Sequence, residues 1–471
     1  MSRLFKPLDY EATLDMSVRL GDCLPADHLA RFIVDIVEQL DLSALYATYG
    51  KRGGAPYAPK MMIALLFYAY STGVFSSRKI EQATRETAAF RFLAGNYSPD
   101  HDTLAAFRKQ FLPQLKDLFV QILLLAQQMG LGELGNISLD GTKIHADASK
   151  SKAVSYKRLL EIEALLQAEV QQLFALAEQA DSALPEGMNL PQELARREDR
   201  LKRLAEAKAV LEARAAERHT LEVAEYEAKM AERQDKEEQT GKKSRGKPPT
   251  PPTPGPHEGD QYNFTDPESR IMKNCRDGGF SQQYNGQIAV EYQSRLVVGF
   301  SLSNHANDQL EVKPTLSNIP PELGKVKAAS LDTGFFSKSN VAALEAEEIE
   351  AYIATGREAH NRGYAAYFAE AGTPPAEGAS LKEKMAYKLR TATGKAIYRL
   401  RKCTVEPVFG IIKEAMGFRQ FSLRGQQNVT DERHGGALYC FRRVTISQCL
   451  FVCASASNEW PPFPATLTSA P

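Results

Sequence analysis

The sequence predicts an α/β domain with a mixed sheet and flanking helices, interrupted by a helical or coiled-coil insertion and preceded by an all-α N-terminal domain. Three observations lead to this fold class. Apolar residues recur at helical spacing through residues 1–130, and short apolar runs ending in an acid follow further along the chain. Between the first two of these runs lies a long charged stretch with Leu at heptad-like spacing.

The N-terminal region is expected to be helical throughout. Helical spacing runs through 28–45, 59–72 and 76–93, with Gly73 and Gly95 as punctuation. The segments SSRKIEQATRETAAF and SPDHDTLAAFRKQF open with Ser or Asp caps and carry cations on their polar faces, as in a helix-turn-helix module. A small helical bundle that makes protein contacts explains the same pattern.

Two aspartates end short apolar runs. Asp140 lies in GNISLDGTK and Asp332 in KVKAASLDTGFF, and each is followed at once by Gly or Thr-Gly. This pattern predicts buried strands that stop with an acidic side chain at the sheet edge, where it is badly placed for packing. Two carboxylates on neighbouring strand ends, with a third on a helix, can hold a pair of divalent cations.

A third acid, Glu406, lies among cations in the helical segment YRLRKCTVEPVFGIIK. Glu406 and Lys413 are seven positions apart, so we expect them on one helix face, opposite the apolar side chains of Val408 and its neighbours. The cations at the start of the helix are unfavourable to its dipole and suit a polyanion outside the chain. A solvated helix with an ordinary salt bridge is the simpler explanation for Glu406 alone.

These segments resemble the DDE transposases of bacterial insertion sequences, whose catalytic domain has an RNase H-like fold. The matching text is ISLDGTKIHADASK, SLDTGFFSKSN and YRLRKCTVEPVFGIIKEAMGFRQFSLRG around the three acids. Further matches are NFTDPESRIMK, QYNGQIAVEY and an N-terminal block from APKMMIALLFYAY to FRKQF. The resemblance covers most of residues 1–428.

The resemblance implies a DNA transposase that cuts and rejoins DNA at the ends of its own element. Asp140, Asp332 and Glu406 would be the catalytic triad and bind two Mg²⁺ or Mn²⁺ ions. The implied partner is double-stranded DNA, namely terminal inverted repeats and target DNA, and a homodimer is expected. The residues implied to bind DNA are Tyr398, Arg401, Lys402 and Lys413 near the third acid, with Arg78 and Lys79 in the N-terminal domain.

The third motif departs from the family pattern of Tyr, two residues, Arg, three residues, Glu, six residues, Lys. Four residues separate Arg401 from Glu406 here, whereas Lys402 would restore the shorter gap. Which of the two cations plays the Arg part is open at this point. After Gly425 the resemblance fades.

The insertion over 156–236 is expected to form a helical hairpin, broken once at 184–187. Its narrow apolar stripe, with Leu194 and Leu201 and then Leu204 and Leu211, suggests that the arms pack on each other or on a second protomer. The cations from Arg196 to Arg203 suit either DNA or a solvated charged face. The Pro-rich stretch 237–260 reads as a flexible linker.

Beyond the linker, alternating residues over 284–292 and 296–302 predict a β-hairpin. Asn307 is expected to cap a helix that reaches about residue 318, and 326–331 is the strand that delivers Asp332. A helix over 339–347, a strand over 351–354 and a basic helix over 382–402 complete the domain. Asn285 and Gln287 alternate with Ile288 and would face either nucleic acid or a surface partner.

Composition bounds the remaining alternatives. The chain has 471 residues, 43% of them apolar, and its 58 basic residues balance 58 acidic ones. Charge is nevertheless local, because 381–424 holds eleven Lys or Arg against three acids. Six scattered cysteines without a CxxC pair indicate neither a disulfide framework nor a zinc site. With no signal peptide or membrane span recognised, we expect a cytoplasmic bacterial protein, nucleoid-associated when bound to DNA.

The expected domain boundaries follow from these segments. They are 1–130 (helical, DNA binding), 131–155 (first part of the catalytic domain), 156–236 (helical hairpin), 237–260 (linker), 261–428 (remainder of the catalytic domain) and 429–471 (divergent tail). Two other functions remain open: a DNA-binding protein derived from a transposase with decayed catalysis, and an RNase H-like nuclease that does not join strands.

Overall fold

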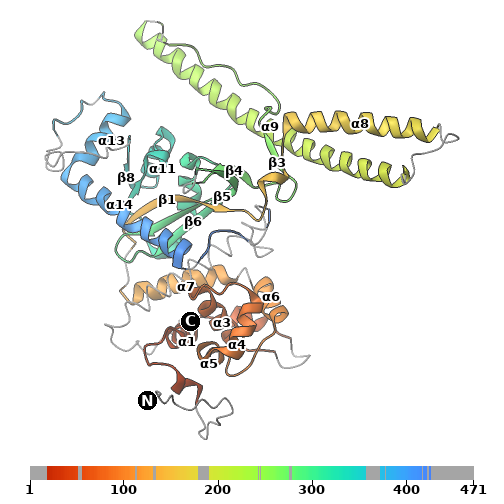
Figure 1. Ribbon diagram of the computed structural model, residues 1–471. Coiled ribbons are helices and arrows are strands. Elements are labelled where there is room, and N and C mark those ends of the chain that lie inside the picture. Colours follow the sequence, from red (N-terminus) through yellow and green to blue (C-terminus); the bar gives the residue numbers. More distant parts are fainter. Residues whose placement is uncertain are drawn as a thin grey trace, which may run out of the picture. The chain divides into compact units, whose positions relative to one another are not determined.

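The computed structural model describes residues 19–50, 56–111, 114–130, 134–178, 190–241, 243, 246–274, 278–356, 372–376, 378–415, 417–421 and 424–425. Their contacts divide the chain into two compact units, Met1–His145 with Tyr284–Pro471, and Ala146–Gln283 (Figure 1). The predicted break at 184–187 and the predicted tail at 429–471 lie outside the described residues.

Helices make up the N-terminal part of the first unit. They are η1 (Leu20–Cys23), α1 (Leu29–Gln39), α2 (Ser43–Ala47), α3 (Pro59–Ser71), α4 (Ser77–Glu86), α5 (Ala88–Leu93), α6 (His101–Gln110) and α7 (Gln114–Gln128). Helix α3 is buried almost all round, because apolar and aromatic residues occupy every face of it. It therefore forms the centre of this helical region.

Two expected helices are each divided in the structure. The pattern over 28–45 predicted one helix, but the Asp41 carboxylate accepts the Ser43 N–H at 2.9 Å and starts the separate helix α2. The pattern over 76–93 is split at Thr87, whose backbone is extended. Asp100 caps α6 by accepting the Thr103 N–H at 2.7 Å, as a helix cap should.

The sheet combines parallel and antiparallel pairs. Its strands in the first unit are β1 (Asn136–His145), β5 (Phe280–Glu291, from Tyr284 onward), β6 (Val297–Ser303), β7 (Ala328–Leu331) and β8 (Glu350–Ile353). They lie in the order β6-β5-β1-β7-β8. β5 and β6 are antiparallel, whereas β1 with β7 and β7 with β8 are parallel.

β5 and β1 run antiparallel to each other. The Tyr292 N–H donates to the Asn136 carbonyl at 3.0 Å, and the Ala146 N–H donates to the Gln282 carbonyl at 2.9 Å, so the numbers rise along one strand as they fall along the other. β1 therefore does not stop at Asp140, as its sequence suggested, but continues to His145. The reason is that β5, a longer strand than β7, supplies ladder partners past the end of β7.

Helices connect and flank these strands. They are η3 (Asp308–Leu310), α10 (Val312–Ser317), η4 (Pro321–Leu323), η5 (Thr333–Phe335), α11 (Lys338–Ala346), α13 (Leu381–Arg390), α14 (Ala392–Gly410) and the π-helical turn η6 (Ile411–Ala415). Helix α14 packs across β1, β7 and β8. The basic helix expected over 382–402 is broken at Thr391, whose hydroxyl accepts the Gly394 N–H and caps α14.

The second unit consists of two long helices and short strands. Its elements are η2 (Lys150–Lys152), β2 (Ala153–Ser155), α8 (Tyr156–Glu178), α9 (Leu190–Thr240), β3 (Gln261–Asn263), β4 (Arg270–Lys273) and the first residues of β5. β2 and β3 pair antiparallel, and β4 pairs antiparallel with Phe280 to Gln283 of β5. Val154, Leu159 and Leu166 form a buried core with Leu204, Ala207 and Leu211 of α9.

Helix α9 and the stretch after it differ from the expected boundary and linker. The helix continues to Thr240, past the predicted start of the linker at 237. The described residues 246–260 then lie back along α9. Arg233 donates to the carbonyls of Gly246 and Lys247, and one guanidinium nitrogen of Arg218 lies 3.0 Å from both carboxylate oxygens of Asp260. Among the described residues, no helix is long and apolar enough to cross a membrane.

Candidate active site

Asp140 and Asp332 lie side by side at the carboxyl end of the parallel pair β1 and β7. The register pairs Ser138 with Ser330, and continuing it by two residues places Asp140 opposite Asp332. β7 ends at Leu331, and Asp332 caps η5 by accepting the Gly334 N–H at 2.8 Å. The Asp140 carboxylate accepts its neighbouring Gly141 N–H at 2.8 Å. The two carboxylates therefore meet at one edge, although only Asp332 ends its strand.

Arg401 of α14 joins the two aspartates. Its guanidinium lies 2.9 Å from the Asp140 carboxylate and 3.7 Å from that of Asp332, and its side chain is only 10% exposed. Lys402, the next residue, is exposed. The structure thus brings Arg401, rather than Lys402, to the carboxylates.

The surroundings of Asp140 at this sheet edge disfavour the charged form of its carboxyl group. Burial raises the pKa of Asp140 to about 6, against the lowering effect of Arg401 and of the Gly141 N–H. The charges of Asp332 and Asp308 raise the same pKa further. Asp140, Asp332 and Asp308 therefore share a region in which, within the described part of the chain, Arg401 and Lys143 form ion pairs with them.

Asp308, the residue after the predicted helix cap Asn307, is a carboxylate that the sequence analysis did not single out. It accepts hydrogen bonds from Asn285 at 2.7 Å and Gln287 at 2.8 Å, and Lys143 lies 3.2 Å away. The alternation of polar residues along β5 was the only available signal. Asn285 and Gln287 are buried, so the expectation that they face nucleic acid or a surface partner is wrong. They hold Asp308 instead.

Glu406 lies on α14 but is not brought into this cluster. Its side chain is exposed, and within the part of the chain that the structure describes it makes no hydrogen bond or ion pair. Five positions separate it from Arg401, which turns its side chain well away from the face that meets Asp140. Val405, Val408 and Ile412 are buried and attach this helix to the core.

Lys413 contacts the strand that carries Asp140. Its ammonium donates to the Thr142 hydroxyl and to the Lys143 carbonyl at 3.2 Å. The residue lies in the π-helical turn, so Glu406 and Lys413 are not related by seven steps of one regular α-helix as the sequence suggested. The wider turn brings the Lys413 side chain to β1.

The other residues expected to bind DNA are accessible to different degrees. Tyr398 is half-buried on α14. Arg78 and Lys79 are exposed in the first turn of α4, while the neighbouring Ser77 and Ile80 are buried. These two cations therefore project from the helical region, and their contact with DNA stays a prediction.

The donor chemistry of the aspartate pair suits a hard divalent cation, although three acids are not assembled. Carboxylate oxygens are preferred ligands of Mg²⁺ and Mn²⁺, and the named acids outnumber the cations that contact them. Among the residues that the structure describes, no group of three or more His, Cys, Asp or Glu is arranged to hold a metal ion. Asp140 and Asp332 fit such an ion, and Glu406 is outside the pair.

Comparison with known proteins identifies the class to which this fold and site belong. A family model described as "Transposase domain (DUF772)" matches residues 18–110, and one described as "Transposase DDE domain" matches residues 250–439. The chain belongs to the DDE transposases of the insertion-sequence type. No curated protein and no solved structure matches it.

The matched ranges include most of the candidate residues. Arg78 and Lys79 lie in the first range, and Asp332, Arg401, Glu406 and Lys413 lie in the second. Asp140 lies between the two ranges, so its place in the site rests on the register of β1 with β7. Family membership implies DNA as a partner and an enzyme that cleaves DNA and transfers strands, with divalent ions in general use among members.

Proposed function

We propose that this protein is a metal-dependent transposase that cleaves DNA and transfers strands at the ends of its own insertion sequence. The observation that carries the proposal is the juxtaposition of Asp140 and Asp332 at the ends of β1 and β7, with Arg401 between them. A strand order of β6-β5-β1-β7-β8, with two parallel pairs after an antiparallel hairpin, supports an RNase H-like catalytic domain.

Asp140 and Asp332 would hold the divalent ions. Glu406, the third acid of the family motif, lies apart from this pair, so its part in metal binding stays a prediction from the motif. When bound, a pair of Mg²⁺ or Mn²⁺ ions would activate the attacking hydroxyl and stabilise the leaving oxygen of a phosphodiester. Within the chain, Gly141 and Gly334 orient the two carboxylates through their N–H groups. Arg401 offsets part of the charge that burial makes unfavourable at Asp140.

DNA contacts would come from residues other than the two aspartates. Lys402 is exposed one residue beyond Arg401, and Tyr398 lies one turn before Lys402 on the same helix. Arg78 and Lys79 would contact duplex DNA from α4. We also propose a homodimer, because a transposition reaction must bring two element ends together.

The test is a cleavage and joining assay with the DNA that flanks the coding region in its source genome. Asp140→Asn and Asp332→Asn should abolish Mg²⁺-dependent cleavage while DNA affinity stays within a few fold, because an amide keeps the side-chain shape and loses the charge that holds the ions. Glu345→Gln removes an exposed acid of α11 and serves as the matched control.

Three outcomes would overturn the proposal in different ways. Full cleavage by Asp332→Asn would remove Asp332 from the site. Wild-type binding of the element ends without cleavage in Mg²⁺ or Mn²⁺ would favour a DNA-binding protein derived from a transposase. Cleavage that never yields joined 3′ ends would instead indicate a nuclease of the same fold.

A further inference from the structure

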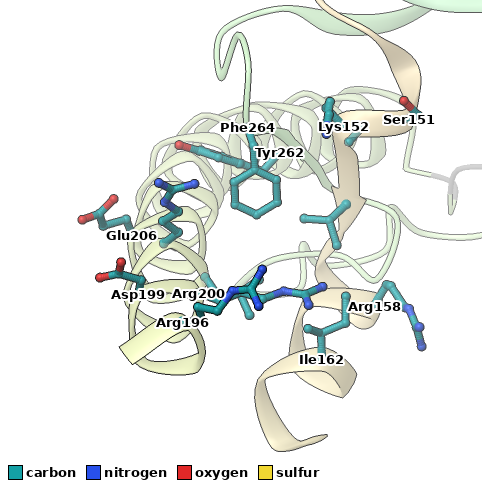
Figure 2. A pocket seen from close by; sticks show the side chains of 14 residues that line it. Ser151, Lys152, Arg158, Ile162, Arg196, Asp199, Arg200, Glu206, Tyr262 and Phe264 are labelled. Carbon is teal, nitrogen blue, oxygen red and sulfur yellow. The ribbon is translucent and has the colours of Figure 1, made fainter. Parts of the chain in front are cut away.

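The second unit contains a basic cavity that the proposed catalytic site does not use. The cavity has a volume of about 940 Å³ and lies where the starts of α8 and β2 face α9 and β3 (Figure 2). Five of its lining residues are cations, namely Lys152, Arg158, Arg196, Arg200 and Arg203. Two lining residues, Asp199 and Glu206, are acids, so the wall carries an excess of positive charge.

Three of the cations come from one face of α9. Arg196, Arg200 and Arg203 are spaced by four and then three positions, which places them above one another on successive turns. Arg158 approaches from α8 on the other side of the cavity (Figure 2). Like charges at this spacing repel each other and destabilise the isolated helix, so they are not explained by helix stability.

Elsewhere on the same helices, cations are paired with carboxylates. Arg197 lies 2.8 Å from Glu169, Lys208 lies 2.9 Å from Glu163, and Arg218 lies 3.0 Å from Asp260. By contrast, within the described ranges neither Arg200 nor Arg203 has an ion pair or a side-chain hydrogen bond. Arg158 and Arg196, which also line the cavity, pair with carboxylates of their own helices, Glu161 at 2.8 Å and Glu193 at 3.1 Å. Among the arginines of the cavity, Arg200 and Arg203 are therefore the two without a carboxylate partner in the described residues.

The floor of the cavity is apolar and includes aromatic rings. Val154 and Leu204 are buried beneath it. Tyr262 and Phe264 stand together from β3 and the residue after it, with ring centroids 5.4 Å apart, and Phe264 remains 42% exposed. A simple inorganic anion would not use this surface, whereas the sugars and bases of a nucleic acid offer apolar faces next to their phosphates.

We propose that this cavity is a DNA-binding site of the insertion, in which Arg200 and Arg203 contact backbone phosphates and Phe264 packs against a sugar or base. The inference rests on the proposed function in taking DNA as the ligand, but it places a second DNA contact outside the carboxylate site. Arginine suits this role because its guanidinium stays charged and donates to phosphate in a fixed geometry.

The test measures DNA affinity of the full chain against salt concentration in EDTA, where no cleavage occurs. Fluorescent 30-base-pair duplex and 30-nucleotide single-strand probes are both used. Arg200→Gln/Arg203→Gln should lower the slope of log affinity against log salt by about two for the duplex, and affinity by roughly tenfold or more in 0.1 M salt. The Lys243→Gln/Lys247→Gln control removes the same charge from exposed residues of the second unit outside the cavity and should change the slope by less than about half a unit.

A charge-preserving variant separates binding from folding. Arg200→Lys/Arg203→Lys should retain most of the salt slope, and both arginine doubles should keep the wild-type unfolding temperature, because these exposed side chains have no partners to lose. The inference would be overturned if the double variant that replaces the two arginines with Gln and the control that replaces two lysines with Gln had equal salt slopes. Unchanged DNA affinity together with a lowered oligomeric mass would assign the cavity to a contact between two copies and overturn it too.

The failure of this inference is distinguishable from failure of the proposed function. If the wild type binds neither probe, the proposed function fails. If the wild type binds and cleaves its element ends but the arginine double binds equally well, only the second DNA contact is refuted.

Discussion

Removing the guanidinium of Arg401 should destabilise the protein by leaving the Asp140 carboxylate buried without its counter-charge. Their side chains are 10% and 20% exposed and 2.9 Å apart. Breaking a fully buried pair by removing one partner costs about 3–5 kcal/mol. Because Asp140 keeps the Gly141 N–H and some contact with solvent, we expect Arg401→Met to cost about 2–3 kcal/mol at neutral pH.

The same argument predicts that the cost depends on the charge of Asp140. Asp140→Asn alone should change stability by less than about 1 kcal/mol, since it removes a buried charge as well as a charged hydrogen bond. In the Asp140→Asn background, Arg401→Met should then cost only about 1 kcal/mol. The double-mutant cycle thus has an expected coupling energy of about 1–2 kcal/mol.

Equilibrium unfolding in urea with EDTA measures these differences. Arg399→Met, which removes an exposed arginine two positions away on the same helix, is the control and should stay within about 0.5 kcal/mol of the wild type. If Arg401→Met behaves like the control, or if its cost is the same with and without the Asp140 charge, the electrostatic account of this pair is refuted.

Three further predictions concern the surroundings of the pair. Lys413→Met should lower the free energy of unfolding by about 1–2 kcal/mol, because it removes the hydrogen bonds of Lys413 to β1, and should leave the slope of log DNA affinity against log salt unchanged. A slope lowered by about one, with unaltered stability, would instead support the phosphate contact that the sequence predicts. Gly141→Ala should lower the free energy of unfolding by about 1–3 kcal/mol, because the added Cβ would clash with the side-chain nitrogen of Gln287 and displace it from Asp308. If the loss is equally large in a Gln287→Ala background, this cause is contradicted. The folded-state pKa of Asp140 is raised from 3.8 to about 6, so the contribution of its carboxyl to stability is fully present below pH 4 and is lost as pH rises through about 6. In EDTA, the free energy of unfolding of the wild type relative to Asp140→Asn should therefore fall across that pH window. A difference that does not change with pH would show that the Asp140 pKa is not raised.

The local elements were largely readable because short-range periodicity produces them. The hairpin of β5 and β6, the strand before Asp332 and the helix after it all follow from alternation, apolar runs and capping residues close together in the chain. The same reading misplaced the end of β1 at Asp140. A strand ends where its partners end, and the partner that extends β1 to His145 is β5, more than a hundred residues further along.

The sequence by itself determined the family and the helical N-terminal region, and it predicted Asp140 and Asp332 as site residues, since family motifs and strand patterns are carried by contiguous residues. Only the tertiary structure decided that Arg401, and not Lys402, meets both aspartates. It also places Asp308, held by Lys143, Asn285 and Gln287, near enough to raise the pKa of Asp140. It also set Glu406 apart from the pair and turned Lys413 toward β1. Such contacts depend on the rotation of α14 over the sheet, which burial of Val405, Val408 and Ile412 fixes and which no spacing within the motif specifies.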